Sequence, residues 1–141
     1  MKNSDEKIAG LGFLQSIISR MASNSFYIKG WDLTIFIGVI ALKKDATHYG
    51  NAIFWALIVT SISFYLLDAY YLQQERIFRK LYNFLAEKKC DDENVNFLRL
   101  NPAHYKELES VETLKYTSSL FSRTMVSFHV PLIIIILVFF G

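Results

Sequence analysis

The sequence predicts an all-α integral membrane protein, and three observations lead to this fold class. The chain is apolar for its size, because 52% of its 141 residues are hydrophobic and 16% are aromatic. Residues 52–72 form an apolar run with a single charge, Asp68, and a helix of that length matches the hydrocarbon thickness of a bilayer. No glycine or proline interrupts the chain from there to Lys89, so one helix can leave the membrane and enter water. We therefore expect about three membrane helices, with a cytoplasmic helical stalk between the second and third, in a homo-oligomeric bundle.

Residues 1–25 are predicted to form an amphipathic N-terminal helix. Apolar residues recur there at helical spacing and polar residues take the opposite side, as on a helix that lies on a membrane surface or on a partner helix. Ser23–Ser25 offer residue types that are favoured at helix N-caps, so we expect a separate helix to begin after them. The apolar positions are Ile8, Leu11, Leu14, Ile18 and Met21.

Residues 26–72 are predicted to form a membrane helical hairpin. The first segment, 26–42, carries Lys29 and Asp32, and its uninterrupted apolar part of ten residues reaches only about 15 Å. It spans the bilayer if protein shelters the two charges and flanking residues anchor its ends; the alternative is a re-entrant or interfacial helix. A polar loop follows, with Gly50–Asn51 as its turn, and leads into the second span.

The rest of the chain divides into a cytoplasmic basic helical region, residues 73–124, and a C-terminal membrane helix, residues 125–141. Asn101–Pro102 has the residue types of an N-cap followed by proline at the first helical position, which predicts a short helix there. A last helix is expected to begin near Val111 and to include the third membrane run. Pro131 lies within that run and is expected to kink it or to free a carbonyl.

The charge distribution predicts the orientation of the chain in the membrane. Lys and Arg residues near the ends of membrane segments concentrate on the cytoplasmic side of such proteins. Here two of them, Lys43 and Lys44, lie between the first two spans, and nine lie on the other side. The N-terminus and residues 73–124 are therefore expected in the cytoplasm. The nine are Arg20, Lys29, Arg76, Arg79, Lys80, Lys88, Lys89, Lys115 and Arg123.

A cluster of ionisable side chains is expected at the inner level of the membrane. Lys29, Asp32, Asp68 and Arg123 all fall near the cytoplasmic ends of the three spans, and His129 lies about two turns deeper. Ionisable groups at membrane depth tend to face the bundle interior and to pair with each other. We expect the first four to tie the three helices together, with His129 packed or facing a pore. The alternative places the four in the headgroup region, solvated and unpaired.

The second span also carries small polar residues, Thr60, Ser61 and Ser63. In membranes such residues line helix contacts and can equally line a pore.

The basic stalk after the second span is the candidate ligand-binding surface. Its basic residues alternate with aromatic ones, a pattern suited to anionic lipid or to the phosphates and bases of a nucleotide or single strand. Ile77, Phe78, Leu81, Tyr82 and Leu85 recur at core spacing, so this stripe is expected to be buried while the basic side stays available. The candidate ligand-binding residues are Arg76, Arg79, Lys80, Lys88, Lys89 and Lys115.

Enzymatic chemistry finds little support in the sequence. The chain has no glycine-rich phosphate loop, and its lone cysteine, Cys90, forms neither an internal disulfide nor a metal site by itself. Arg123 and His129 have the spacing of the catalytic motif of HEPN ribonucleases, which the chain resembles in this respect. An RNase centre needs water and an RNA backbone, whereas His129 precedes an apolar run. We therefore expect no enzyme, no cofactor and no metal.

Two stretches carry a resemblance to a known family. Residues 21–31 (MASNSFYIKGW) and 67–82 (LDAYYLQQERIFRKLY) are similar to small bacterial membrane proteins encoded in antiphage defence operons. Among these the chain resembles the membrane effector of Hailong-type systems. The resemblance implies a homo-oligomeric channel, with a tetramer as a candidate assembly, opened by a nucleic-acid product of a partner nucleotidyltransferase. The runner-up is the pore-forming accessory protein of type VI CRISPR systems, suggested by the Arg123/His129 spacing.

The leading hypothesis is an oligomeric membrane effector that forms or gates an ion-conducting pore in antiphage defence. Three helices cannot enclose a water path alone, so conduction requires several subunits. The basic stalk would sense a cytoplasmic anionic ligand, a nucleotide or a single-stranded oligonucleotide. Two rivals remain open: a membrane-tethered HEPN-like RNase, and a non-conducting anchor that recruits a soluble defence enzyme.

Overall fold

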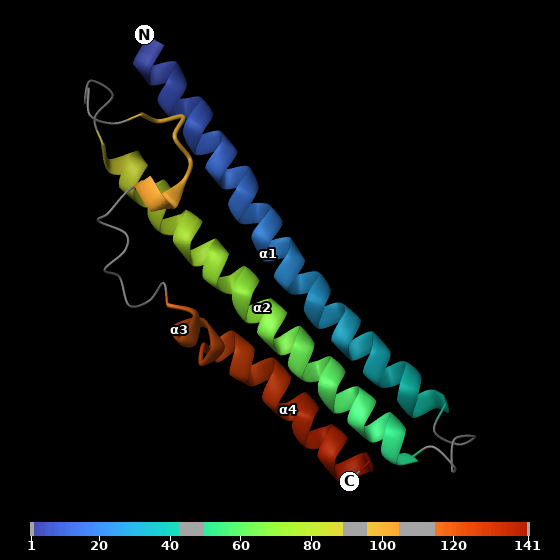
Figure 1. The fold of residues 1–141 in the computed structure, drawn as a ribbon. Helices are drawn as coiled ribbons and strands as arrows, with labels where there is room; N and C mark the ends of the chain where they lie inside the picture. Colours follow the sequence, from blue (N-terminus) through green and yellow to red (C-terminus); the bar gives the residue numbers. More distant parts are fainter. Residues whose placement is uncertain (1, 43–49, 89–95, 105–114, 141) are drawn as a thin grey trace.

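A computed structural model describes residues 2–42, 50–88, 96–104 and 115–140, and all regular structure in these ranges is helical. The all-α prediction is therefore confirmed for this part of the chain. Two long antiparallel helices lie side by side, and a third, shorter helix packs along one half of the second (Figure 1). In chain order the elements are α1 (Lys2–Leu42), α2 (Gly50–Glu87), η2 (Pro102–His104), α3 (Tyr116–Leu120) and α4 (Arg123–Phe140).

Helix α1 runs without a break from Lys2 to Leu42, so the expectation of a new helix after Ser23–Ser25 is wrong. Ser residues act as N-caps when their hydroxyl accepts a hydrogen bond from a backbone N–H of the next turn. Here the Ser25 hydroxyl donates instead to the Asp68 carboxylate of α2. The Ser25 side chain is therefore engaged in a tertiary contact and does not cap a helix, and packing along α2 keeps the α1 backbone helical at this point.

Helix α2 is continuous from Gly50 to Glu87, as the absence of glycine and proline predicts. Gly50 and Asn51 are its first two residues and not a turn, which corrects the expected boundary. The other end of α2 is held by α1, because Lys7 Nζ donates to the carbonyl oxygens of Ala86 (2.8 Å) and Lys88 (2.6 Å). A cation at the final carbonyls satisfies groups that the helix itself leaves without partners.

Two separate apolar cores hold the helices together, one near each end of the bundle. The first core contains Leu14 of α1, Leu81 and Leu85 of α2, and Phe97. Phe78 and Tyr82 pack against it, which confirms the predicted core stripe on α2. The second core lies at the opposite end and joins α1, α2 and α4 through Phe36, Leu57, Leu132 and Ile136.

Residues 96–104 cross over the first core and pack against α1. The short helix η2 begins after Asn101, whose side-chain oxygen accepts a hydrogen bond from the Ala103 N–H at 3.1 Å. The N-cap predicted at Asn101–Pro102 is therefore present, although only one 3₁₀ turn follows within the described residues.

The predicted last helix is divided in the described part of the chain. Residues 105–114, where it was expected to begin, lie outside the described residues. Helix α3 ends at Leu120, and α4 begins at Arg123 after a break at Phe121–Ser122. The Ser122 hydroxyl accepts from the backbone N–H of Met125 at 3.4 Å, so it serves as the cap of α4. Helix α4 then stays helical through Pro131.

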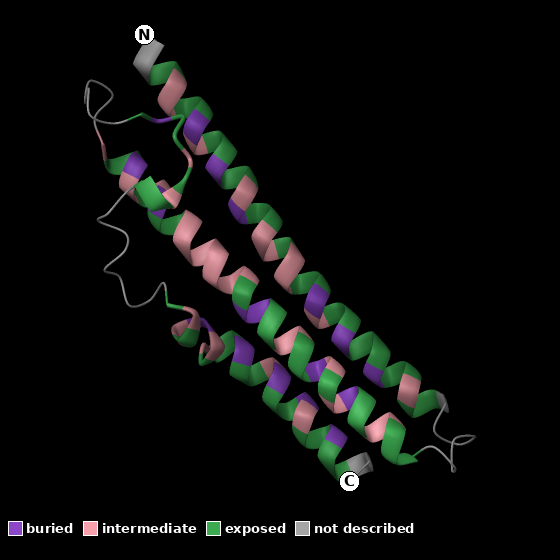
Figure 2. Ribbon diagram, viewed as in Figure 1, coloured by how far each residue is buried: buried purple, intermediate pink, exposed green. Residues whose placement is uncertain are grey.

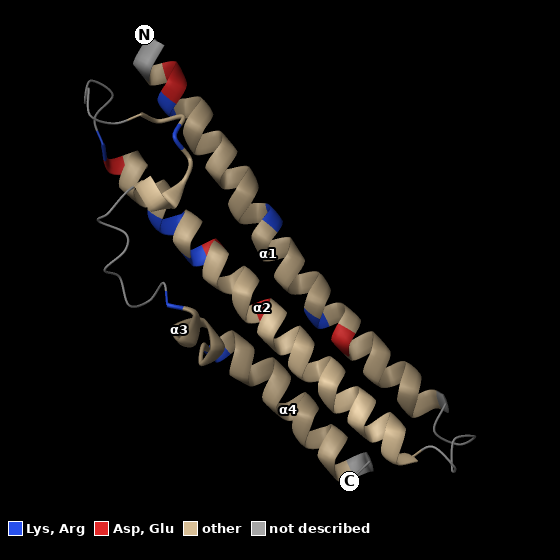
Figure 3. Ribbon diagram, viewed as in Figure 1, with Lys and Arg blue, Asp and Glu red and all other residues tan. Residues whose placement is uncertain are grey.

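The second half of the bundle is apolar on the outside as well as the inside. Residues 33–42, 50–67 and 124–140 contain no Lys, Arg, Asp or Glu, and these segments pack together (Figure 3). Their outward faces are exposed (Figure 2), and the exposed residues include Trp55, Val59 and Val138. Helix α2 is long and apolar enough to cross a membrane, and α4 is a shorter apolar helix. Only 22% of the most apolar 18-residue stretch of α2 is buried, unlike the core helix of a soluble protein.

Candidate functional site

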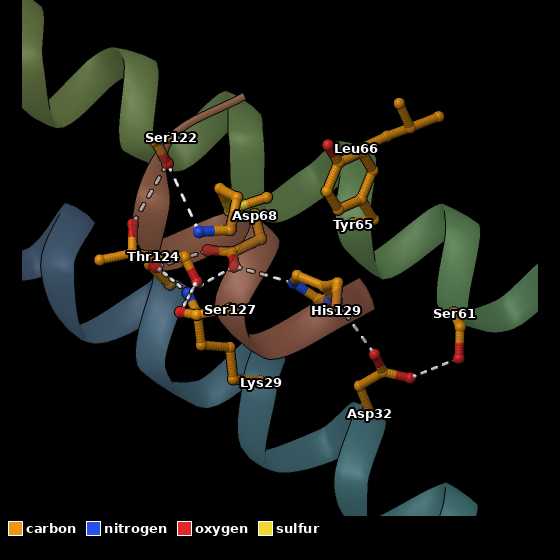
Figure 4. A network of polar contacts seen from close by, with 12 residues as sticks. Lys29, Asp32, Ser61, Tyr65, Leu66, Asp68, Ser122, Thr124, Ser127 and His129 are labelled. Carbon is orange, nitrogen blue, oxygen red and sulfur yellow. Dashed lines mark hydrogen bonds and ion pairs between the residues drawn. The ribbon is translucent and has the colours of Figure 1, made fainter. Parts of the chain in front are cut away.

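A cluster of mostly buried polar side chains lies between the two apolar cores and joins α1, α2 and α4 (Figure 4). We call it the polar cluster. Three of its four ionisable members are almost fully shielded, since Asp68 is 0% exposed, His129 1% and Asp32 2%, whereas the Lys29 side chain is partly exposed. Charged groups are buried at this level only when they pair with each other. The polar cluster consists of Ser25, Lys29 and Asp32 on α1, Ser61 and Asp68 on α2, and His129 on α4.

Each of the two long helices contributes a serine and an aspartate to the polar cluster, and the two residues are equally far apart in sequence on both helices. A serine and an aspartate stand seven residues apart on each helix, Ser25 and Asp32 on α1 and Ser61 and Asp68 on α2. Seven residues are close to two turns, so each pair lies on one helix face. Because the helices are antiparallel, Ser25 meets Asp68 and Ser61 meets Asp32. The cluster therefore has two levels, separated by about 10 Å along the bundle axis.

The first level is built around the Asp68 carboxylate. It accepts a hydrogen bond from the Ser25 hydroxyl and forms an ion pair with the Lys29 ammonium. Lys29 Nζ also donates to Ser25 Oγ at 2.9 Å. Lys29 lies one turn further along α1 than Ser25, and helical side chains lean toward the N-terminus, which brings its ammonium back to this level. The positive charge of Lys29 balances the negative charge of Asp68.

The second level is built around Asp32. Its Oδ1 accepts a hydrogen bond from the Ser61 hydroxyl at 2.9 Å. Its Oδ2 lies 3.3 Å from His129 Nδ1, and these two buried atoms have no hydrogen-bond partner among the described residues. Asp32 has no lysine beside it to match the pair at the first level. Its negative charge faces the imidazole alone.

His129 of α4 connects the two levels. Its Nε2 lies 3.1 Å from Asp68 Oδ2, while its Nδ1 faces Asp32. A neutral imidazole carries one N–H, so one of its nitrogens would present a lone pair to a carboxylate; an imidazolium carries two. The ring is held edge-to-face between Tyr65 and Phe128, with centroid distances of 5.3 and 5.0 Å. Its orientation is therefore fixed by packing as well as by the carboxylates.

The structure brings together Lys29, Asp32 and Asp68, three of the four residues expected to pair. The expected place of Arg123 is wrong: it is the exposed first residue of α4 and forms no hydrogen bond or ion pair with the described residues. His129 takes its place as the contribution of the third helix. The expectation of a single level is also wrong, because Asp32 lies two turns deeper than Asp68. Burial of the two aspartates and the ion pair of Lys29 with Asp68 exclude the solvated, unpaired alternative for these three residues. The exposed Arg123 is consistent with that alternative.

Sequence reasoning missed Ser25, Ser61 and Tyr65 as members or neighbours of the polar cluster. The signal that could have revealed the serines is the repeated spacing of serine and aspartate on the two helices. It becomes meaningful only when the helices are known to be antiparallel neighbours.

The other two small polar residues of α2 lie outside the polar cluster. Ser63 is exposed, and its hydroxyl donates to the Val59 carbonyl of its own helix at 2.7 Å. Thr60 is half-buried and lines a cavity of about 280 Å³ between α1 and α2. The other lining residues are apolar: Ile35, Val39, Ile53, Ala56 and Leu57.

The candidate ligand-binding residues of the stalk do not converge on one pocket. Arg76 donates to the Ser118 carbonyl at 3.2 Å and so serves to hold α3. Arg79 is exposed and pairs with Glu75 at 2.7 Å, and Lys80 is exposed beside it. Lys88 lies over the Phe84 ring, 4.7 Å from its centroid. Lys115 is exposed before α3, and Lys89 lies outside the described residues.

Helix α3 is fastened to α2 by two tyrosines in addition to Arg76. The Tyr116 hydroxyl donates to the Leu66 carbonyl at 2.8 Å, and the Tyr65 hydroxyl donates to the Leu120 carbonyl at 2.7 Å. Burial and the neighbouring Tyr65 raise the pKa of the Tyr116 hydroxyl above its ordinary value of 10.0, so this donor keeps its proton at neutral pH. Tyr65 also packs on His129, which links α3 to the polar cluster.

The arrangement can store or transfer a proton, because each His129 nitrogen faces a carboxylate oxygen. Among the described residues, no three His, Cys, Asp or Glu side chains are grouped as for a metal ion. His129 is buried with both nitrogens toward carboxylates, so an RNA backbone cannot reach it in this conformation. Comparison of the chain with known protein families, curated proteins and solved structures gives no match.

Proposed function

We propose that this chain is a subunit of an oligomeric membrane effector that conducts ions across the bacterial inner membrane. The polar cluster is the observation that supports this most. It buries two carboxylates and a histidine, with a partly exposed lysine beside them, next to an outwardly apolar half of the bundle that has no Lys, Arg, Asp or Glu in the described ranges. Ionisable residues at membrane depth are costly and commonly mark ion pathways or proton relays.

In this proposal α2 and α4 span the bilayer together with the C-terminal half of α1. The polar cluster shelters Lys29 and Asp32, which removes the sequence objection to α1 as a membrane segment. One chain has three such helices, so the conducting path requires a homo-oligomer, for which a tetramer is the candidate. The N-terminus and the stalk lie in the cytoplasm.

A cytoplasmic anionic ligand controls opening in this proposal. The exposed cations Arg79 and Lys80 are its first contacts, and α3, held by Arg76, carries the signal toward Tyr65 and His129. By the resemblance in residues 21–31 and 67–82, the ligand is a nucleotide or oligonucleotide from a partner nucleotidyltransferase, and the setting is antiphage defence.

Ion flux from liposomes that contain the purified protein tests the proposal. We expect leakage of K⁺ or H⁺ that increases when single-stranded oligonucleotides are added. The double variant Arg79→Glu/Lys80→Glu should lose this increase and keep the basal flux. Arg20→Glu is the control, because Arg20 is also exposed but lies on α1.

Absence of flux under every condition would contradict the channel and favour a non-conducting anchor. The anchor also predicts a stoichiometric soluble partner that is lost on charge reversal of the stalk.

A further inference from the structure

We infer that the ion moved by this protein is the proton, and that the contact between Asp32 and His129 is its binding site. This inference rests on the proposed function and specifies its ion. Asp32 Oδ2 and His129 Nδ1 are buried, lie 3.3 Å apart and have no other hydrogen-bond partner among the described residues. One proton between the two atoms satisfies both of them. No other ion fits between an oxygen and a nitrogen at this separation.

The charges around the imidazole sum to zero when the polar cluster holds one exchangeable proton. Lys29 balances Asp68 at the first level, so these two groups form a neutral pair. At the second level, Asp32 and His129 together are neutral when they share one additional proton, either as carboxylic acid and imidazole or as carboxylate and imidazolium. Without that proton the buried cluster carries a net negative charge, which is costly in a low dielectric. The charged groups that face His129 come from α1 and α2 and are those named here.

The transfer step follows from the orientation of the ring. A proton on Asp32 Oδ2 moves to the Nδ1 lone pair: the O–H bond breaks, an N–H bond forms, and a carboxylate faces an imidazolium. The proton on Nε2 then passes to Asp68 Oδ2, which breaks that N–H bond and leaves a neutral imidazole. Histidine acts as a shuttle in this way because its two nitrogens accept and release protons separately. The same two transfers in the reverse direction restore the starting tautomer, with the Nδ1 proton returning to Asp32 Oδ2 and the Asp68 proton returning to Nε2.

The step runs along the bundle axis. The backbones of Asp32 and Asp68 lie on levels about 10 Å apart, and their carboxylates reach toward the ring between them, so the proton itself moves over less than this distance. Beyond Asp32, the Ser61 hydroxyl is followed by Thr60, which borders the cavity between α1 and α2. Beyond Asp68, the Lys29 side chain is 21% exposed and reaches the surface. The proton site therefore has a cavity on one side and a partly exposed cation on the other.

The wild-type protein gives the first test, in planar bilayers with equal K⁺ on both sides. A tenfold proton gradient should shift the reversal potential by about 59 mV. Replacement of K⁺ by a large organic cation should leave that potential unchanged. A reversal potential that follows K⁺ or Cl⁻ overturns this inference while the proposed channel stands. Absence of any current overturns the proposed function and this inference with it.

Two near-isosteric variants give the second test. His129→Gln keeps a polar side chain of similar reach but cannot exchange a proton, and Asp32→Asn keeps the shape of the side chain but removes its titratable carboxyl group. Each should lower proton flux in liposomes at least tenfold while helix content and detergent elution remain those of the wild type. Ser127→Ala is the control, since Ser127 is exposed and its hydroxyl donates to the Thr124 carbonyl of its own helix, and its flux should be unchanged. Wild-type proton flux in both folded variants would overturn the inference.

Discussion

Among the described glycines, Gly10 has the least room for an added methyl group. A Cβ built on it would lie 2.1 Å from the Phe97 carbonyl oxygen, whereas a Cβ on Gly12 meets nothing within 4 Å. Both glycines are in α1, two residues apart. The first glycine therefore allows residues 96–104 to approach the helix, and the second has no such role.

We expect Gly10→Ala to lower the free energy of unfolding by about 1–2 kcal/mol, because strain from overpacking exceeds the gain in helix propensity. Gly12→Ala should instead raise it by up to about 1 kcal/mol. Chemical unfolding in detergent, followed by circular dichroism, measures both. A shift of the two variants in the same direction would show that the contact with Phe97 has no energetic consequence.

At the scale of elements, α3 is a five-residue helix that cannot be stable by itself. Arg76 and two tyrosines hold it against α2, and Tyr65 connects it to the imidazole at the centre of the polar cluster. Helix α3 therefore contacts the stalk through Arg76 and lies beside the polar cluster through Tyr65. In the proposed function, this short helix is one route by which ligand binding at the stalk can affect the polar cluster.

Arg76→Ala is expected to release α3 from α2. The guanidinium hydrogen bond to the Ser118 carbonyl is charge-assisted, and such bonds contribute about 1.5–3 kcal/mol. Backbone amide exchange in residues 116–120 should therefore become at least tenfold faster. Lys80→Ala is the matched control on the same helix, because Lys80 is exposed and forms no hydrogen bond or ion pair with the described residues. Equal exchange in the two variants would mean that the tyrosines alone hold α3.

At the scale of the whole molecule, charge divides the bundle into two halves. Lys, Arg, Asp and Glu lie on the half near the N-terminus, and the half beyond Asp32 is apolar inside and outside in the described ranges (Figure 3). The polar cluster lies at the boundary. A membrane would cover the apolar half and leave the stalk in water, with the buried charges near the inner surface.

Thiol labelling in intact cells checks this orientation. Cys90 is the only cysteine of the chain, so it reports on the stalk without mutation. A membrane-impermeant maleimide should label Cys90 only after the inner membrane is permeabilised. In a Cys90→Ser background, Ala46→Cys should be labelled before permeabilisation, because the proposed orientation places this position on the outer side of the membrane. The reverse pattern would mean that the hairpin is inverted.

Sequence alone determined the helical class, the unbroken α2, most of the core stripe on that helix and the presence of paired charges between the helices. These follow from periodicity and apolar run length, which are local properties of the chain. Tertiary structure decided which charges meet. Ser25 pairs with Asp68 in place of capping a helix, Asp32 lies a second level away, and His129 enters where Arg123 was expected. The physical reason is the register of the helices relative to each other. A shift of one helical turn moves a side chain by about 5 Å, which is further than a hydrogen bond reaches. The register is set by the two apolar cores, which combine residues from several segments of the chain.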